Sequence, residues 1–141
     1  MTSFDIIIRL VLATVSGGLI GMERESINKP AGFRTHILVC LGSTTIMIIG
    51  ILLFEQYKGM TTLDPARLGA QVISGIGFLG AGTIMKEGLT VKGLTTAASL
   101  WVVACVGLAI GGGFYITAIA LTILILLILL FFHKFEKCLN R

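Results

Sequence analysis

The sequence predicts an all-α integral membrane protein, built as one domain over residues 1–141 with a bundle of five transmembrane helices. The chain is 55% hydrophobic, and its mean hydropathy is +0.99. Only 13% of its residues are charged, whereas about a quarter are charged in a soluble domain. The hydrophobic residues also form long runs with charged residues at their ends, as expected for helices that cross a bilayer.

The first three apolar runs predict helices over about residues 4–22, 37–54 and 68–85. Each run is close to the roughly 20 residues that cross a hydrocarbon layer about 30 Å thick. The first run lacks the basic residues that precede the core of a signal peptide, so we expect it to be retained as a helix. Asp64 and Pro65 have the residue types of an N-cap and a first helical position, and they predict the start of the third helix.

The stretch 93–132 has no charged side chain, and it is about twice as long as one span requires. It therefore predicts two helices. The turn signal is the run 111–113 of three glycines, followed by the aromatic pair Phe114 and Tyr115, which is typical of a membrane interface. This turn divides the stretch into spans of about 95–111 and 114–132.

The distribution of basic residues predicts that the N-terminus lies outside and the C-terminus in the cytoplasm. In this orientation the loops and tail on the cytoplasmic side hold most of the 11 Lys and Arg residues, while the outer loop holds only Lys58 and Arg67. An excess of Lys and Arg in short cytoplasmic loops is the usual determinant of orientation. The net charge of +4 follows from this topology, and we expect no nucleic-acid partner.

The third predicted span contains "GIGFLG" at 75–80, which matches the G-x-G-x-x-G pattern of dinucleotide-binding turns. Such a turn needs a preceding strand and an acidic residue about 20 positions later, and both are missing. Small residues in a membrane helix instead predict close helix packing. The residues expected to pack in this way are Ser74, Gly75, Gly77, Gly80, Ala81 and Gly82. We expect this helix to be the most closely packed in the bundle; the alternative is a helix broken at mid-membrane, whose free backbone groups hold an ion.

Two groups of polar residues near the span ends are candidate sites, because polar and charged groups in or near lipid are costly. The cytoplasmic group comprises Glu23, Arg24, Glu25, Arg34, His36, Thr95 and Thr96. The outer group comprises Asp5, Arg9, Asp64, Arg67 and Gln71. For the outer group we favour a structural clasp over an ion or partner site, and for the cytoplasmic group the alternative is a set of headgroup anchors.

The sequence contains no recognisable set of nucleophile, base and orienting residue, so we expect no enzymatic activity. The two histidines, His36 and His133, flank predicted spans at the cytoplasmic face. No cofactor is evident, and the residue pattern leaves the identity of any metal ion open.

Several long motifs resemble, in order and spacing, the membrane region of the MgtC/SapB family of bacterial proteins. They are "GMERE", "KPAGFRTH", "LVCLGS", "DPARLGAQVISGIGFLGAG" and "VKGLTTAASLWVVACVGLAIGGGFY". The resemblance implies an inner-membrane, multi-pass protein linked to growth when magnesium is scarce and, in pathogens, to survival in host cells. Longer members carry a soluble cytoplasmic domain after the last span, so we expect a short form that lacks this domain.

The resemblance leaves two functions open. The first is a regulator that acts on other membrane proteins through helix contacts, with F-type ATP synthase as the partner that the family implies and self-association as a second possibility. The second is a magnesium transporter or channel with a pathway at the third helix. Mg²⁺ favours carboxylates, and no acidic residue lies at the middle of a span. A pathway would depend on backbone carbonyls and on hydroxyls such as those of Thr44, Thr45 and Thr83, so we favour the regulator.

Overall fold

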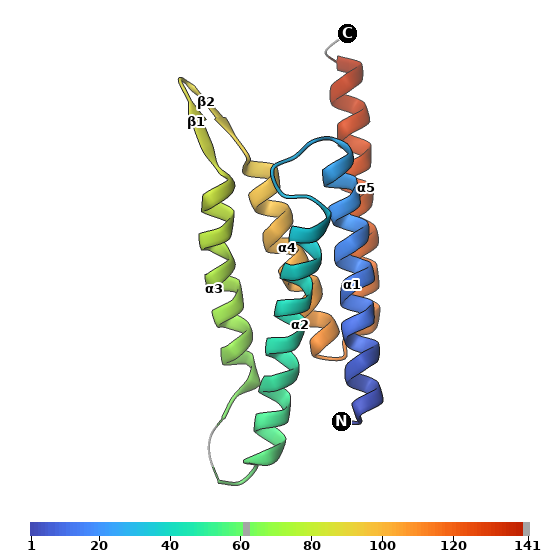
Figure 1. Cartoon of the computed structure of the whole chain (residues 1–141), viewed down its shortest axis with the longest axis vertical. Helices are drawn as coiled ribbons and strands as arrows, with labels where there is room; N and C mark the ends of the chain where they lie inside the picture. The colour runs from blue at the N-terminus through green and yellow to red at the C-terminus, as the bar shows by residue number, and fades with distance from the viewer. Residues whose placement is uncertain (61–62, 140–141) are drawn as a thin grey trace.

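The computed structural model describes residues 1–60 and 63–139, and it describes the side chains of these residues as far as Phe131. Within these ranges the chain forms a helical bundle with one small β-hairpin (Figure 1). The helices are α1 (Ser3–Ser26), α2 (Phe33–Gln56), α3 (Pro65–Thr83), α4 (Leu94–Gly111) and α5 (Tyr115–Leu139). The hairpin consists of β1 (Met85–Glu87) and β2 (Thr90–Lys92), and it connects α3 to α4.

Successive helices run in opposite directions, so the chain passes up and down the bundle (Figure 1). We call the end that holds the α1–α2 loop and the hairpin the hairpin end, and the opposite end the N-terminal end. Helix α4 contacts each of the other four helices, whereas α3 packs on α2 and α4 at one side. The helix α5 lies beside α1 and α4 at the other side.

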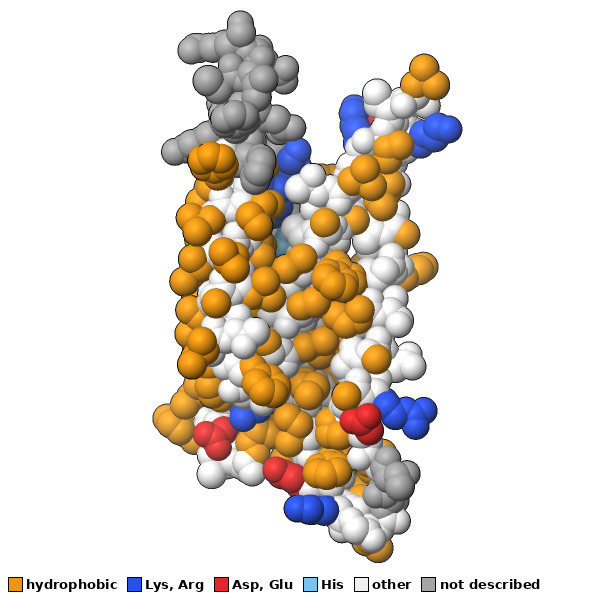
Figure 2. All heavy atoms as spheres, turned by 180° about the vertical axis from the view of Figure 1, so that it is seen from behind, with side chains coloured by type: hydrophobic (Ala, Val, Ile, Leu, Met, Phe, Trp, Pro, Cys, Tyr) orange, Lys and Arg blue, Asp and Glu red, His pale blue; other side chains and the backbone are white. Residues whose placement is uncertain are grey.

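The length and apolar composition of the helices suit a protein that spans a membrane. In the described residues, α1, α2 and α4 are each long and apolar enough to cross a bilayer. The described part of α5, Tyr115–Phe131, is a shorter apolar helix. On the face shown in Figure 2, hydrophobic side chains cover the middle of the bundle, and charged side chains gather towards its two ends. This distribution is expected when the middle lies in hydrocarbon and the ends in headgroups.

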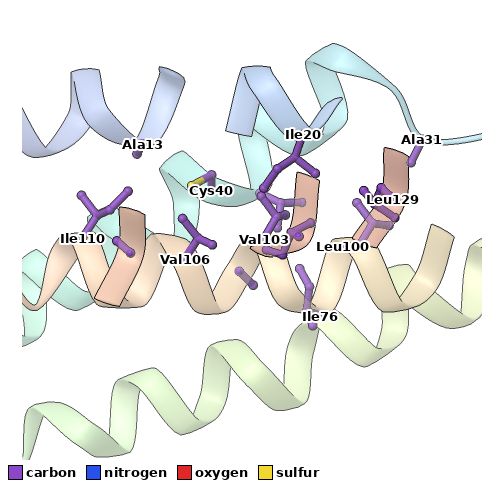
Figure 3. Close-up of a cluster of buried hydrophobic side chains, with 14 residues drawn as sticks. Ala13, Ile20, Ala31, Cys40, Ile76, Leu100, Val103, Val106, Ile110 and Leu129 are labelled. Carbon is purple, nitrogen blue, oxygen red and sulfur yellow. The ribbon is translucent and has the colours of Figure 1, made fainter. Parts of the chain in front are cut away.

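The core is centred on α4 (Figure 3). Its residues Leu100, Val103, Val106 and Ile110 are at most 1% exposed, and they contact side chains from the surrounding helices. Contact with all four other helices explains why the α4 sequence is apolar on most of its sides. The prediction of two helices from the run 93–132 is confirmed, because Gly113 adopts a left-handed backbone with φ of +82° and ends α4 just before α5.

The closest contacts between helices are made at glycines of α1 and α4. A Cβ atom at Gly107 of α4 would lie 2.4 Å from the carbonyl oxygen of Cys40, and one at Gly17 of α1 would lie 2.8 Å from the carbonyl oxygen of His36. Both contacts are with the backbone of α2, which has little freedom to move away. A hydrogen bond of 2.8 Å from the Thr44 hydroxyl to the Gly107 carbonyl adds to the α2–α4 contact.

The expectation that the third helix is the most closely packed is wrong. Helix α3 lies at the edge of the bundle, and its buried residues are Gly69, Ile76 and Gly80. Added Cβ atoms at Gly75, Gly77 and Gly82 would meet nothing within 4 Å. The helix is also continuous from Pro65 to Thr83, which rules out a helix broken at mid-membrane. Its start is as predicted, because the Asp64 side chain accepts a hydrogen bond of 2.9 Å from the Ala66 amide.

The hairpin is a correction to the all-α prediction. The helix α3 ends at Thr83, and the segment expected to finish the third span begins β1 at Met85 instead. Gly88 in the turn has φ of +61°, which glycine adopts without strain. Gly93 has φ of +92°, and a Cβ atom there would lie only 1.9 Å from the Thr83 carbonyl oxygen. Glycine at this position therefore permits the chain to return from the hairpin into α4.

Candidate functional site

A buried ion pair lies in α1 near the hairpin end. The guanidinium of Arg24 donates two hydrogen bonds to the carboxylate of Glu23, one through Nε and one of 2.7 Å through a terminal nitrogen. The side chains are only 3% and 7% exposed, respectively. A bidentate pair of this kind is strong, and breaking it would leave an uncompensated buried charge. The carboxylate is therefore neutralised from within the protein.

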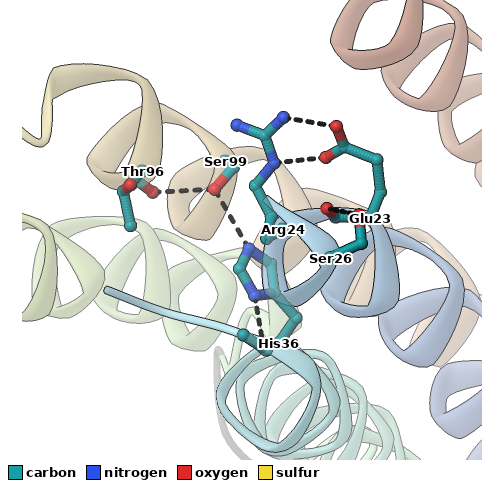
Figure 4. Close-up of polar contacts among 7 residues, drawn as sticks. Glu23, Arg24, Ser26, His36, Thr96 and Ser99 are labelled. Atoms are coloured by element: carbon teal, nitrogen blue, oxygen red, sulfur yellow. Dashed lines mark hydrogen bonds and ion pairs between the residues drawn. The ribbon is translucent and has the colours of Figure 1, made fainter. Parts of the chain in front are cut away.

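A chain of polar contacts links α2 to α4 beside this ion pair (Figure 4). The His36 ring makes a contact of 2.8 Å from Nδ1 to the Gly32 carbonyl oxygen and one of 3.0 Å from Nε2 to the Ser99 hydroxyl. The Ser99 hydroxyl donates a bond of 2.8 Å to the Thr96 carbonyl. We call Glu23, Arg24, His36, Thr96 and Ser99 the hairpin-end cluster.

The contacts around His36 fix the roles of its two ring nitrogens. A carbonyl only accepts, so Nδ1 carries the hydrogen that is donated to Gly32. In the neutral ring Nε2 then accepts, and the donor within reach is the Ser99 hydroxyl at 3.0 Å. The one hydrogen of this hydroxyl is shared between His36 and the Thr96 carbonyl.

The cluster does not present its groups to a substrate. His36 is 0% exposed and Ser99 is 5% exposed, although their side chains have the spacing of a base and a hydroxyl nucleophile. Within the described part of the chain, no three His, Cys, Asp or Glu side chains are grouped so that they could hold a metal ion. His133 was also predicted at this face, and its side chain lies outside the described residues.

The other residues predicted for the cytoplasmic group do not join the cluster. Glu25 is exposed, and it accepts a hydrogen bond of 2.7 Å from the Phe33 amide, which fixes the start of α2. Arg34 and Thr95 are exposed. Sequence reasoning missed Ser99, although its spacing of three from Thr96 places both residues on one face of α4 and could have revealed it.

The predicted outer clasp does not form as one cluster. Arg9 instead joins α1 to the α4–α5 turn: it donates a hydrogen bond of 3.1 Å to the Tyr115 hydroxyl and another to the Gly111 carbonyl. Its guanidinium also lies 5.8 Å from the centre of the Tyr115 ring. The prediction omitted Tyr115, whose hydroxyl supplies the acceptor that a cation in a span requires.

The remaining residues of the predicted clasp have local roles or are exposed. Asp5 forms a capping box with Thr2 at the start of α1, and Asp64 caps α3. Arg67 and Gln71 are exposed on α3. The reason is geometric, since α1 and α3 lie on opposite sides of the bundle (Figure 1).

The outward face of α3 carries a stripe of small residues, which we call the outer α3 stripe. It consists of Ala70, Ser74, Gly77 and Ala81, all exposed. Successive members are three or four residues apart, so they lie on one side of the helix. Phe78, which is 82% exposed, projects beside the stripe. Of the residues predicted for helix packing, only Gly80 is buried, against Ala97 of α4.

Comparison with known proteins establishes the family. The model of the MgtC family matches residues 10–138. The chain belongs to the MgtC family. The resemblance identified from the sequence motifs is thereby confirmed. No solved structure matches the chain.

Relatives in several bacteria share 44% of the aligned residues with this MgtC-family chain. They include "Putative magnesium transporter YhiD" of Escherichia coli K12, aligned over 92% of this chain and 61% of the relative. Others are "Protein SapB" of Bacillus subtilis, over 87% and 54%, and "Protein MgtC" of Salmonella typhimurium, over 89% and 52%. The chain thus spans little more than half the length of these relatives.

Proposed function

We propose that this MgtC-family chain is a five-span inner-membrane protein, with its N-terminus outside, that supports magnesium homeostasis by regulating other membrane proteins. It acts without enzymatic chemistry, through helix contacts made by the outer α3 stripe. The observation that carries the proposal is the exposure of this stripe, where Gly77 has open space around it.

Small residues on an outward face favour a protein contact over a purely lipid one. The outward face of α1 shows the usual alternative, with Phe4, Val11 and Val15 between 52% and 70% exposed. Large side chains of this kind fill the space between a helix and lipid tails. Small residues allow another helix backbone to approach closely, and membrane helix interfaces are enriched in them for this reason. The exposed ring of Phe78 beside the stripe offers a large apolar anchor for the same contact.

The partner that the family resemblance implies is F-type ATP synthase, and a second copy of this chain is the other candidate. The first is testable in inverted membrane vesicles from cells that contain or lack the chain. Slower ATP synthesis with the wild-type chain, relieved by Gly77→Leu, is the result that supports this partner. Equal rates in all vesicles would exclude it and leave self-association to be tested by the size of the purified protein.

Magnesium transport is the alternative, and the name of the Escherichia coli relative favours it. The contacts in this chain favour it less. The hydroxyls of Thr44, Thr45 and Thr83 all donate to backbone carbonyls, and the Glu23 carboxylate is occupied by Arg24. Mg²⁺ loses its water reluctantly and is usually held by carboxylates with several waters. A cation next to the guanidinium would also meet electrostatic repulsion.

The groove along α3 is also poorly suited to a hydrated cation. A cavity of about 830 Å³ lies between α2 and α3. Its walls are mainly aliphatic, and its polar side chains are Thr35, Ser43 and Gln71. The Ser43 hydroxyl donates to the Val39 carbonyl.

Magnesium flux into liposomes that contain only this chain separates the two functions. We expect no uptake above that of protein-free liposomes at any gradient. Uptake that is lost in Glu23→Gln or Asp64→Asn would establish transport and overturn the regulatory proposal. A fluorescent magnesium indicator inside the liposomes provides the measurement, and an ionophore added at the end confirms that the indicator responds.

A further inference from the structure

A second concave site lies at the hairpin end, away from the outer α3 stripe and next to the hairpin-end cluster, with which it shares Thr96. Its volume is about 430 Å³, and it is enclosed by the α1–α2 loop, the hairpin and the first turn of α4. Lys29 of the loop and Lys92 of β2 line the pocket. Lys92 also pairs with Glu87 across the hairpin, whereas Lys29 has no ion pair among the described residues. The side chains around the pocket thus give it a positive charge.

The start of α4 adds hydrogen-bond donors to this pocket. The N-cap residue Gly93 has no side chain and provides no cap hydrogen bond. The first amide that donates within the helix is that of Ala97, at 2.9 Å from the Gly93 carbonyl. The amides of Leu94, Thr95 and Thr96 precede it and are the free donors of a helix N-terminus. Such amides, together with the helix dipole, favour an anion.

The Thr96 side chain is a second, independent feature of this pocket. It lines the pocket and is only 1% exposed. Among the hydrogen bonds of the described residues, its carbonyl accepts from Ser99 but its hydroxyl has no partner. The other buried hydroxyls, those of Ser43, Thr44, Ser99 and Thr122, each donate to a backbone carbonyl. No fully enclosed side-chain oxygen lacks a partner in the described structure, so the Thr96 oxygen retains an opening on the pocket that it lines.

We propose that this pocket binds a phosphate group, held by Lys29, the Thr96 hydroxyl and the first amides of α4. Phosphate oxygens accept from a hydroxyl, from amides and from an ammonium group at the same time, so one group satisfies all the donors. The exposed apolar side chains of Met85, Val91 and Leu94 also line the pocket. They provide a surface for the glycerol and upper acyl chains when the phosphate belongs to a lipid. The same donors would hold free inorganic phosphate.

The experiment uses the full chain in two arms, with inorganic phosphate as the first probe and lipid as the second. In the first arm, the unfolding temperature in nonionic detergent is followed as inorganic phosphate replaces chloride at constant ionic strength. In the second arm, the chain is taken from bilayers containing phosphatidylglycerol and phosphatidylcholine, and lipid retained on the protein is measured by native mass spectrometry. Both arms use the variants Lys29→Gln and Thr96→Val, with Lys58→Gln, which lies after α2 at the opposite end of the bundle, as the control.

We expect Lys29→Gln to weaken binding about tenfold and Thr96→Val about fivefold, from the loss of one charge-assisted and one neutral hydrogen bond. The Thr96→Val variant should fold normally, because its hydroxyl bonds to no described residue. Stabilisation by inorganic phosphate that follows this pattern identifies free phosphate as a ligand. Selective retention of phosphatidylglycerol with the same pattern, and no response to inorganic phosphate, identifies the lipid headgroup. Failure of both probes, or equal binding by all variants, would overturn the proposal.

Discussion

Replacing Glu23 with glutamine tests how much the buried ion pair of α1 contributes to the stability of the bundle. The change removes the negative charge while keeping nearly the same shape, and it leaves the Arg24 guanidinium charged at 3% side-chain exposure. Breaking a buried pair by removing one partner costs about 3–5 kcal/mol. The glutamine oxygen can still accept one hydrogen bond, which returns about 1 kcal/mol. We therefore expect the free energy of unfolding to fall by about 3 kcal/mol.

The assay is unfolding in mixed micelles, followed by loss of far-ultraviolet circular dichroism as the denaturing detergent increases. The matched control is Glu87→Gln, which breaks the Lys92–Glu87 pair of the hairpin, where both side chains are more than half exposed. An exposed pair contributes less than about 1 kcal/mol. If Glu23→Gln costs no more than Glu87→Gln, the ion pair does not stabilise the bundle as argued.

Four further substitutions test other contacts by the same unfolding assay. Gly107→Ala places a Cβ atom 2.4 Å from a backbone oxygen of α2, so we expect the free energy of unfolding to fall by about 1–3 kcal/mol. Gly77→Ala lies on the open face and should leave stability unchanged or raise it by up to about 1 kcal/mol. Equal effects of the two substitutions would contradict the packing described. Ser99→Ala removes the partner of His36 Nε2 and should cost about 1–3 kcal/mol, and an unchanged midpoint would show that the contact contributes nothing. Arg9→Lys keeps the charge but loses the planar guanidinium that bonds to both the Tyr115 hydroxyl and the Gly111 carbonyl. We therefore expect the free energy of unfolding to fall by about 1–2 kcal/mol, and unchanged stability would refute a role for the guanidinium.

The helices themselves were predictable from the sequence because their signals are local. Uninterrupted apolar runs fixed five helices near their observed positions, and Asp64-Pro65 and the glycines at 111–113 marked two of the boundaries. The hairpin at 85–92 was not predicted. Its two strands are only three residues each, so periodicity offers too little signal.

The arrangement of the helices was less predictable, because it depends on contacts between distant residues. The glycines of α3 and of α4 look alike in the sequence. In the structure, however, Gly107 faces the backbone of α2, whereas Gly77 faces open space. Sequence patterns show which residues share a helix face but not which face meets a neighbour. The same limit applies to Arg9, whose partner Tyr115 is 106 positions away.

Growth at low magnesium tests the central claim, that the outer α3 stripe is the working surface of this MgtC-family chain. The measurement compares a deletion strain carrying the wild-type chain, Gly77→Leu or Val15→Leu, with equal membrane levels confirmed for all three. Leucine at position 77 fills the stripe without a clash inside the bundle, and position 15 is an exposed control on α1. We predict that the wild type and Val15→Leu restore growth and that Gly77→Leu does not. Full restoration by Gly77→Leu would contradict the account.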